Sequence, residues 1–277
     1  MTNRACIQSL MIMILAACSS ALARPKIIAH RGASYDAPEN TLAAFNLAWQ
    51  QGADAIECDV QLTQDGKIVC IHDATTKRVA NRNVIVKETP LAELRLLDVG
   101  SWKDPNRANE RIPTIDEVFG TVPEDGMVFV EIKCSSAVFG PLKKAVARSG
   151  LRNEQVAVID FDTEVIAEAK RQLAGIKTYW LTGFTKDEKT GQWKPTIRDV
   201  LSTLRKINAD GVGCQRRRLV NRSFVNELRK ACKKSNVWVI DEPSMAKQFS
   251  DIGVDSLSTN RPGYLIEHLR GLTKKRN

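Results

Sequence analysis

From residue 26 onward, short apolar runs rich in β-branched residues alternate with segments in which apolar residues recur at helical spacing. This alternation is typical of parallel βαβ units. The sequence predicts strands at Lys26–His30, Asp54–Val60, Lys67–His72, Met127–Lys133, Gln155–Asp160, Ile176–Leu181, Asp210–Cys214, Asn236–Asp241 and Val254–Ser258. It predicts helices in a segment that Asn40 caps and Gly52 ends, and at Leu91–Leu97, Ile115–Phe119, Val138–Ser149, Glu164–Leu173, Ile197–Ile207, Phe224–Cys232, Met245–Phe249 and Leu265–Leu269.

The third predicted strand lies too close to the second to run parallel to it. Six residues separate Val60 from Lys67, whereas a right-handed parallel crossover needs a dozen or so. Asp65-Gly66 is a favoured pair for a two-residue hairpin turn, which would set His72 opposite Asp59. Eight parallel strands remain, and eight is the number that closes a barrel. The expected fold class is therefore α/β, a (β/α)8 TIM barrel with a β-hairpin insertion after the second strand.

The N-terminal segment is expected to lie outside this barrel. Its apolar run, residues 7–17, follows a single charge and is too short to span a membrane, but it suits the core of a signal peptide. Residues 1–23 are either a signal peptide cleaved after Ala23 or a lipoprotein leader that ends before Cys18, because Leu15-Ala16-Ala17-Cys18 resembles a bacterial lipobox. The barrel domain is expected at residues 26–272. The protein is expected to be exported, either periplasmic or secreted, or lipid-anchored through Cys18.

Charge narrows the choice of partners. The formal net charge is +9, and removing a leader whose only charge is Arg4 leaves +8. A positive protein favours encounter with small anionic substrates or with an anionic membrane surface. Nucleic acid is not an expected partner, because the basic residues are scattered and no aromatic-basic reader motif is present. Arg216-Arg217-Arg218 and the polar loop at residues 184–193 both follow predicted strands, so they fall on one face as a candidate guide for anions and a candidate lid.

Charged residues stand at the carboxyl ends of three predicted strands, where barrel enzymes place their catalytic groups. They are His30, Arg31, Glu57, Asp59, Glu131 and Lys133. Strand side chains alternate, so the three acids face the mouth while Cys58 and Ile132 face the helices. Crowded carboxylates repel unless a cation compensates them. One oxygen-liganded divalent cation, Ca²⁺ or Mg²⁺, is therefore expected, held by Glu57, Asp59 and Glu131.

Two of the three histidines, His30 and His72, are expected at the same mouth. A pair of histidines beside an anion site suits general acid and general base work near neutral pH. Arg31 can hold nonbridging phosphate oxygens in a fork, and Lys133 can do so as a point charge. This combination indicates phosphoryl chemistry.

Sequence blocks in the same order resemble the glycerophosphodiester phosphodiesterase family. HRGASYDAPENTLAAF begins at His30 and ECDVQLTQDGKIVCIHD at Glu57, and EIK, VWVID and STNRP follow at Glu131, Val237 and Ser258. The resemblance covers nearly all of the chain after the leader. It implies a metal-dependent hydrolase that releases glycerol 3-phosphate and an alcohol, with His30 and His72 as acid and base.

The resemblance further implies that Glu57, Asp59 and Glu131 bind the metal, that Arg31 and Lys133 bind the phosphate, and that Glu39 supports the histidine loop. Trp238 is a candidate wall for the alcohol, with plain core packing as the alternative. Asp241 and Asn260 stand where the family usually has Asn and Asp, and Asp160-Phe161 replaces a more usual Ser-Phe. These departures concern substrate preference more than chemistry.

Two other functions remain open at this point. One is a phospholipase-D-like or phosphatidylinositol-specific phosphodiesterase of the same superfamily, which a hydrophobic insertion at the mouth would favour. The other is a catalytically inactive surface binding protein, against which the intact histidines and acids speak.

Overall fold

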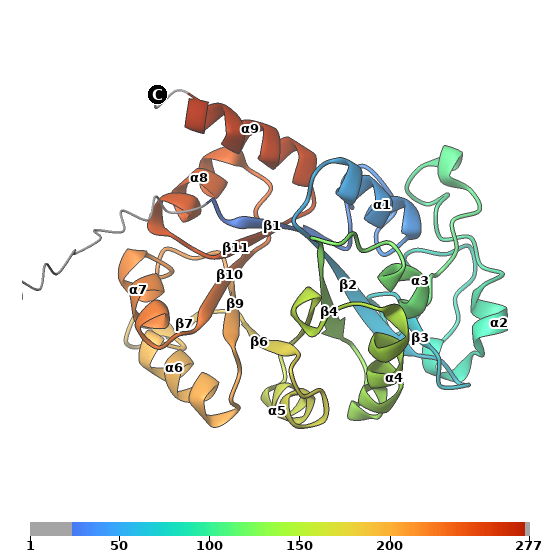
Figure 1. Ribbon diagram of the computed structural model, residues 1–277, viewed down its shortest axis with the longest axis horizontal. Coiled ribbons are helices and arrows are strands. Elements are labelled where there is room, and N and C mark those ends of the chain that lie inside the picture. The colour runs from blue at the N-terminus through green and yellow to red at the C-terminus, as the bar shows by residue number, and fades with distance from the viewer. Residues whose placement is uncertain (1–23, 275–277) are drawn as a thin grey trace, which may run out of the picture.

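The computed structural model describes residues 24–274 and forms a closed barrel of eight parallel strands surrounded by helices (Figure 1). In chain order the barrel strands are β1 (Lys26–His30), β2 (Ala55–Leu62), β4 (Met127–Ile132), β5 (Val156–Asp160), β6 (Lys177–Thr182), β9 (Gly211–Gln215), β10 (Lys234–Trp238) and β11 (Ser256–Thr259). Pairing of β1 with both β11 and β2 closes the ring. The (β/α)8 prediction is confirmed. The predicted leader, including Cys18, lies outside the described residues.

The strands are buried on both faces, as parallel strands covered by helices must be. Toward the barrel axis, Ile28, Phe129, Tyr179 and Leu181 belong to one interior cluster. Side chains on the other face pack with the helices in two larger clusters, one around β2 and β4 and one around β9 to β11. The expected alternation is confirmed for Cys58, which belongs to the cluster that includes helical Phe139. The acids next to it therefore face inward.

The helices are α1 (Leu42–Gln50), α2 (Leu91–Leu94), α3 (Ile115–Phe119), α4 (Phe139–Ser149), α5 (Thr163–Gln172), α6 (Ile197–Lys206), α7 (Arg222–Lys230), α8 (Pro243–Ile252) and α9 (Pro262–Lys274). The expected cap of the first helix was wrong by one residue. Thr41 is the N-cap, and its hydroxyl accepts from Ala44 N at 3.2 Å. Asn40 has a left-handed backbone with φ 56°, which turns its side chain away from the helix start. Among residues 24–274, no helix combines the length and apolar character needed to cross a membrane.

The insertion after β2 is a hairpin, but its register differs from the expected one. β3 (Ile68–Cys70) runs antiparallel to β2 with Val60 opposite Cys70. Thr63 N donates to Lys67 O at 2.9 Å, and Gly66, at φ 69°, closes a three-residue loop instead of a two-residue turn. Asp59 therefore faces Ile71, whose N–H donates to Asp59 O at 3.0 Å. His72 is not opposite Asp59, although it still reaches the mouth as the chain leaves the strand.

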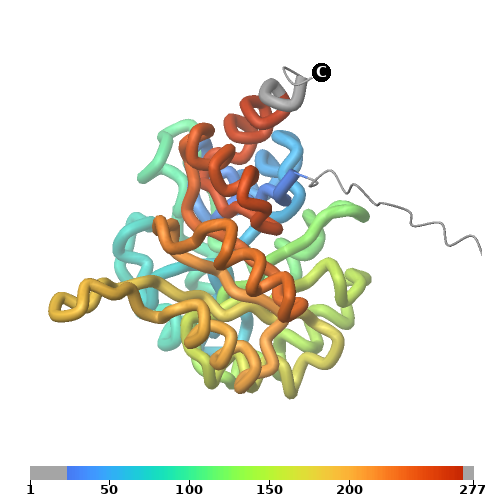
Figure 2. The backbone as a smooth tube through the Cα atoms, turned by 90° about the vertical axis from the view of Figure 1, so that its left-hand side faces the viewer, coloured from blue at the N-terminus to red at the C-terminus, as the bar shows by residue number. Residues whose placement is uncertain are grey.

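The loop predicted at residues 184–193 forms a second, small hairpin of β7 (Thr185–Lys186) and β8 (Trp193–Lys194). Figure 2 shows it as a gold projection that extends away from the barrel. The ring of Trp193 lies 5.6 Å from the guanidinium of Arg217, which follows β9. The two loops singled out in the sequence are thus in contact with each other.

Candidate active site

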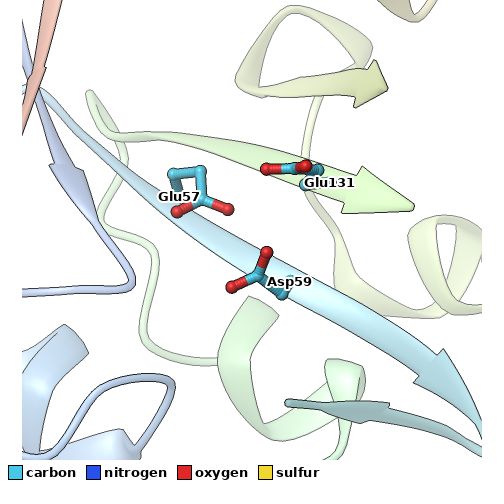
Figure 3. Close-up of side chains that lie close together, drawn as sticks. All are labelled: Glu57, Asp59 and Glu131. Carbon is cyan, nitrogen blue, oxygen red and sulfur yellow. The ribbon is translucent and has the colours of Figure 1, made fainter. Parts of the chain in front are cut away.

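Three carboxylates converge inside the mouth of the barrel (Figure 3). Glu57 and Asp59 project from the same face of β2, and Glu131 projects from β4 at the position paired with Asp59. Ligand atoms of the three lie within 4.8 Å of one another, and the residues are only 2%, 0% and 7% exposed. The predicted metal ligands are therefore brought together.

This cluster is electrostatically incomplete. Glu57 Oε1 and Asp59 Oδ1 are buried and have no hydrogen-bond partner within residues 24–274. Burial, and then repulsion from Asp59 and Glu131, raises the pKa of Glu57 well above its ordinary value. Burial and the charge of Asp59 raise the pKa of Glu131 to about 7. Carboxylate oxygens without partners are the donors that a hard divalent cation requires, so the cluster fits such an ion.

The two predicted phosphate-binding cations border the acids. Arg31 Nε lies 3.0 Å from Asp59 Oδ2, and its backbone N–H donates to Glu57 Oε2 at 2.8 Å. Lys133 Nζ forms an ion pair with Glu131 and lies 3.5 Å from Asp59 Oδ1. Two cations thus face three acids. If all three acids are ionised, one negative charge is left that these two cations do not compensate.

Asn40 fixes Asp59 in place, which the sequence analysis missed because it assigned Asn40 to a helix cap. Its Nδ2 donates to Asp59 Oδ2 at 2.8 Å, and its Oδ1 accepts from Asp59 N at 3.1 Å. This two-point contact leaves Asp59 Oδ1 as the oxygen free to bind an ion. The only sequence signal was the position of Asn40 inside the PENT stretch.

A pocket of about 290 Å³ opens over the acids and has two different walls. Its polar wall consists of His30, Arg31, Glu57, His72, Glu131 and Lys133. Its apolar wall includes Ile159, Phe161, Leu181 and Trp238. Glu39 stands outside this lining and binds Arg31 from behind, with Oε1 3.0 Å from Arg31 Nη1. An anionic group and an apolar or alcoholic group can therefore bind side by side.

The two histidines on the polar wall have different partners. His30 Nδ1 lies 2.8 Å from Asn260 Oδ1, and Asn260 Nδ2 donates to Asp241 at 2.8 Å. Burial and the nearby charge of Arg31 lower the pKa of His30. His72 Nδ1 instead lies 2.6 Å from a carboxylate oxygen of Asp73.

The apolar wall includes an aromatic pair, only half of which was anticipated. The rings of Phe161 and Trp238 meet edge to face at 5.6 Å. Phe161 is 49% exposed, and its backbone oxygen accepts from Trp180 Nε1 at 3.0 Å. Trp238 lines the pocket and also packs against the interior cluster, and its Nε1 is buried without a hydrogen-bond partner among the described residues. Beside the pair, burial raises the pKa of Asp160 to about 6.

Comparison with known proteins agrees with this geometry. The model of the glycerophosphoryl diester phosphodiesterase family matches residues 30–264. A glycerophosphodiester phosphodiesterase of Caldanaerobacter subterraneus subsp. tengcongensis is 32% identical over 88% of this chain and 97% of the relative. One from Bacillus subtilis is 25% identical over 85% of this chain and 83% of the relative.

Among solved structures, an Oleispira antarctica phosphodiesterase in complex with the product sn-glycerol-3-phosphate superimposes with a TM-score of 0.78. It shares 25% sequence identity, and the match covers 89% of this chain and 97% of the other. The resemblance seen in the sequence motifs is confirmed across the barrel. The chain therefore belongs to the glycerophosphoryl diester phosphodiesterase family, whose members are phosphoric diester hydrolases.

Proposed function

We propose that this enzyme hydrolyses small glycerophosphodiesters to glycerol 3-phosphate and an alcohol, using one divalent cation and His30 and His72 as acid and base. The observation that carries the proposal is the joint lining of one pocket by both histidines, two cations and the carboxylate cluster with its unpartnered oxygens. The product named for the Oleispira relative, sn-glycerol-3-phosphate, supports the choice of substrate class.

Glu57, Asp59 and Glu131 would hold the ion, for which Ca²⁺ and Mg²⁺ are the candidates because all three ligands are hard oxygens. When bound, the ion supplies positive charge that favours the phosphate in both ground and transition states. Lys133 and Arg31 bind nonbridging oxygens and stabilise the charge that grows as a fifth oxygen joins phosphorus. Asn40 and Glu39 keep the surrounding side chains in position.

The apolar wall is suited to the alcohol end of the diester. Phe161 and Trp238 give it a rigid aromatic face, and Trp238 Nε1 is a donor without a partner among the described residues. A small headgroup with carbon surface and an oxygen acceptor would match both features.

The first test is glycerol 3-phosphate release from glycerophosphocholine and glycerophosphoethanolamine, in EDTA and then with added Ca²⁺ or Mg²⁺. Metal-dependent release that His30→Ala and His72→Ala each abolish is the expected result. His268→Ala is a matched control, because His268 is exposed on α9, where its Nδ1 lies 2.8 Å from Tyr264 O and its ring lies 4.3 Å from the Tyr264 ring. Cleavage of intact phospholipid without cleavage of short diesters would instead favour the lipase-like alternative.

We also propose that the arginine loop, Arg216-Arg217-Arg218, attracts anionic headgroups or an anionic membrane surface. All three side chains are exposed. Arg216 N donates to Trp238 O at 3.1 Å, so the loop adjoins the apolar wall of the pocket. The Arg217–Trp193 contact adds an exposed aromatic ring, a combination typical of membrane interfaces.

A triple alanine variant of the arginine loop should lose the ionic-strength dependence of kcat/KM and bind anionic vesicles less tightly. The matched control removes three exposed cations at the opposite end of the barrel, Lys177, Arg205 and Lys206. Coincident salt curves for the arginine-loop variant and the wild type would exclude the role.

Export is a further proposal, resting on residues 1–23 of the sequence. The N-terminus of the mature protein, read by mass spectrometry from a bacterial host, distinguishes its two forms. A chain that begins at Arg24 would indicate ordinary cleavage, and a diacylated Cys18 would indicate a lipoprotein that Cys18→Ser releases from the membrane. An intact Met1 would contradict both.

A further inference from the structure

We propose that Asn236, Trp238 and Ser258 form a subsite for a hydroxyl group on the departing alcohol, so that the enzyme prefers diesters of glycerol and similar polyols. The inference rests on the proposed hydrolase function and deepens it by naming the class of alcohol. All three residues line the pocket of about 290 Å³ over the acids. Asn236 and Ser258 add neutral polar atoms to a pocket whose other polar groups are charged side chains and histidines.

Asn236 and Ser258 lie on the inner face of two neighbouring strands. Val237 on β10 and Leu257 on β11 are paired with each other, and both belong to the cluster that packs against the helices. Strand alternation therefore turns Asn236 and Ser258 toward the barrel axis. Trp238 shares this inner face and packs against the interior cluster, which is built from apolar and aromatic side chains of β1, β2, β4, β5 and β6. The polar part of the interior is thus confined to β10 and β11.

The inner polar side chains bind one another but keep spare hydrogen-bonding capacity. Asn236 Nδ2 donates to Ser256 Oγ at 3.1 Å, and Ser258 Oγ donates to Asn236 Oδ1 at 3.2 Å. An amide has two N–H donors and accepts twice, and a hydroxyl oxygen also accepts twice. One Nδ2 hydrogen, one Oδ1 lone pair and the lone pairs of Ser258 Oγ therefore have no partner within residues 24–274. Asn236 is 6% exposed and Ser258 is 7% exposed, so a ligand that pairs with them gains free energy.

Trp238 brings a donor to the same place. A Cβ added at Gly213 would lie 3.4 Å from Trp238 Cδ1 and 3.5 Å from Asn236 Oδ1, so these two side chains converge beside the glycine. Trp238 Cδ1 is bonded to Nε1, which is buried and has no hydrogen-bond partner in the part of the chain that the structure describes. The same Cβ would lie 2.5 Å from Leu181 Cδ2, so only glycine lets these side chains approach one another. One donor and several acceptors are therefore gathered at this point.

A ligand hydroxyl matches this arrangement because it accepts and donates at once. Its oxygen would accept from Trp238 Nε1, and its hydrogen would be donated to Ser258 Oγ or Asn236 Oδ1. The carbon chain that carries the hydroxyl would pack on the edge-to-face pair of Phe161 and Trp238. Glycerol combines a short carbon chain with hydroxyl groups, and so fits both parts of the subsite.

Choline is the informative competitor. Its quaternary ammonium group neither donates nor accepts a hydrogen bond, so it would leave the buried groups of Asn236 and Ser258 unpaired. A cation–π contact with the aromatic pair would favour it, but Phe161 is 49% exposed, and such contacts are weak at exposed rings. Buried polar groups are more costly to leave unpaired. The balance therefore favours the hydroxyl-bearing alcohol.

Three diesters that differ only in the alcohol test this preference. They are the glycerophosphate esters of glycerol, of 1-propanol, which keeps the three carbons but lacks the additional hydroxyls, and of choline. In the wild type, kcat/KM for release of glycerol 3-phosphate should be about tenfold or more higher for the glycerol ester than for the other two, because an analogue without the hydroxyl leaves the subsite unpaired.

Variants of the subsite separate this effect from the intrinsic reactivity of each alcohol, which is the same in wild type and variant. Ser258→Ala and Asn236→Leu should each lower kcat/KM for the glycerol ester about threefold to tenfold and change the other two less than about twofold. Thr178→Val is the matched control. It removes a fully buried strand hydroxyl that has no partner among residues 24–274 and lies outside the pocket lining, so it should not alter the preference. Ser258→Ala keeps the test available if Asn236→Leu does not fold.

The outcomes separate this inference from the function beneath it. A wild type that releases no glycerol 3-phosphate from any of the three esters would overturn the hydrolase proposal and the subsite together. An active wild type that prefers the choline ester, or that cleaves the glycerol and propyl esters equally, would overturn the subsite alone. Equal losses on all three esters in Ser258→Ala would also overturn it, since Ser258 would then act on the part that every substrate shares.

Discussion

Both ends of the barrel hold charged residues, but the two ends differ in how completely those charges are paired. At the amino ends of the strands, a cavity of about 520 Å³ is lined by charged residues that include Arg24, Lys234 and Asp255. Arg24 pairs with Asp54 at 2.6 Å and Lys234 pairs with Asp255 at 2.7 Å. At the carboxyl ends, the pocket is smaller, about 290 Å³, and Glu57 Oε1 and Asp59 Oδ1 have no hydrogen-bond partner within residues 24–274. The candidate active site is therefore distinguished by buried carboxylate oxygens without hydrogen-bond partners, and not by the size of its cavity.

The acids at the amino ends also stabilise the sheet directly. Asp54 accepts from Ile27 N at 2.7 Å, Asp210 from Thr178 N at 2.9 Å and Asp255 from Ser235 N at 2.9 Å. Each of these acids precedes one strand and binds the backbone of a neighbouring one. Within residues 24–274, the carboxylate of Glu57 accepts one hydrogen bond, from Arg31 N at 2.8 Å, and the carboxylate of Glu131 accepts one, from Lys133. The comparison predicts that acids at one end contribute to stability and acids at the other to activity.

Glu131→Gln should give the largest effect of this comparison. If the proposed metal dependence holds, loss of one charged ligand should lower kcat/KM about 10³-fold, since a bound metal contributes several kcal/mol to such reactions. At pH 8 the metal-free variant should nevertheless be at least as stable as the wild type, because burial and Asp59 penalise the charge of Glu131. Steady-state kinetics and urea unfolding measure the two changes. A variant that is both inactive and less stable would contradict the division of roles.

Asp54→Asn should behave in the opposite way. The substitution removes the charge that binds Arg24 at 2.6 and 2.9 Å and weakens the acceptor for Ile27 N. The expected cost is about 1–2 kcal/mol of unfolding free energy. Turnover should stay within about twofold of the wild type. A large loss of activity with unchanged stability would show that the amino end also contributes to the reaction.

A third and smaller effect concerns thermal stability in the absence of metal. The difference in Tm between the wild type and Glu131→Gln should depend on pH. The folded-state pKa of Glu131 is about 7 against an ordinary 4.5. Between these values the folded wild type binds more protons than the unfolded chain, so its stability falls as pH rises. A glutamine side chain does not titrate, so the variant lacks this loss of stability with rising pH. The two Tm values should therefore diverge from pH 5 to pH 8. Adding Ca²⁺ should raise the wild-type Tm most at pH 8, and parallel curves in EDTA would contradict the assignment.

Most of the fold could be predicted from patterns that are local in the sequence. Alternating strands and helices, together with the short gap between Val60 and Lys67, were enough for the barrel and its hairpin. Strand alternation placed Glu57, Asp59 and Glu131 on the inner face, because a strand has only two faces. The register of the hairpin was wrong because Asp65-Gly66 suits more than one turn. A two-residue type I′ turn needs positive φ at both residues, and of the two only Gly66 has it.

The partners of the site residues could not be predicted in this way. Asn260 meets His30 across 230 positions of sequence, and Arg78 meets Glu39 across 39. No periodicity relates residues that belong to different loops. Asp241 and Asn260 were noticed as departures from the family pattern near the mouth. Only the structure shows that Asp241, Asn260 and His30 form one hydrogen-bonded chain.

Lys234→Ala, at the amino ends of the strands, should change stability and activity least of the substitutions considered. Lys234 lines the larger cavity, and its side chain is 56% exposed beside Asp255. Exposed ion pairs contribute about 0–1 kcal/mol, and Asp255 keeps its bonds to Ser235 at 2.9 Å. Unfolding free energy should therefore change by less than about 1 kcal/mol, and kcat/KM should be unchanged. A clear change in KM for a glycerophosphodiester would mean that the larger cavity at the amino ends of the strands binds substrate. The proposed division, in which the charges at that end serve stability alone, would then be wrong.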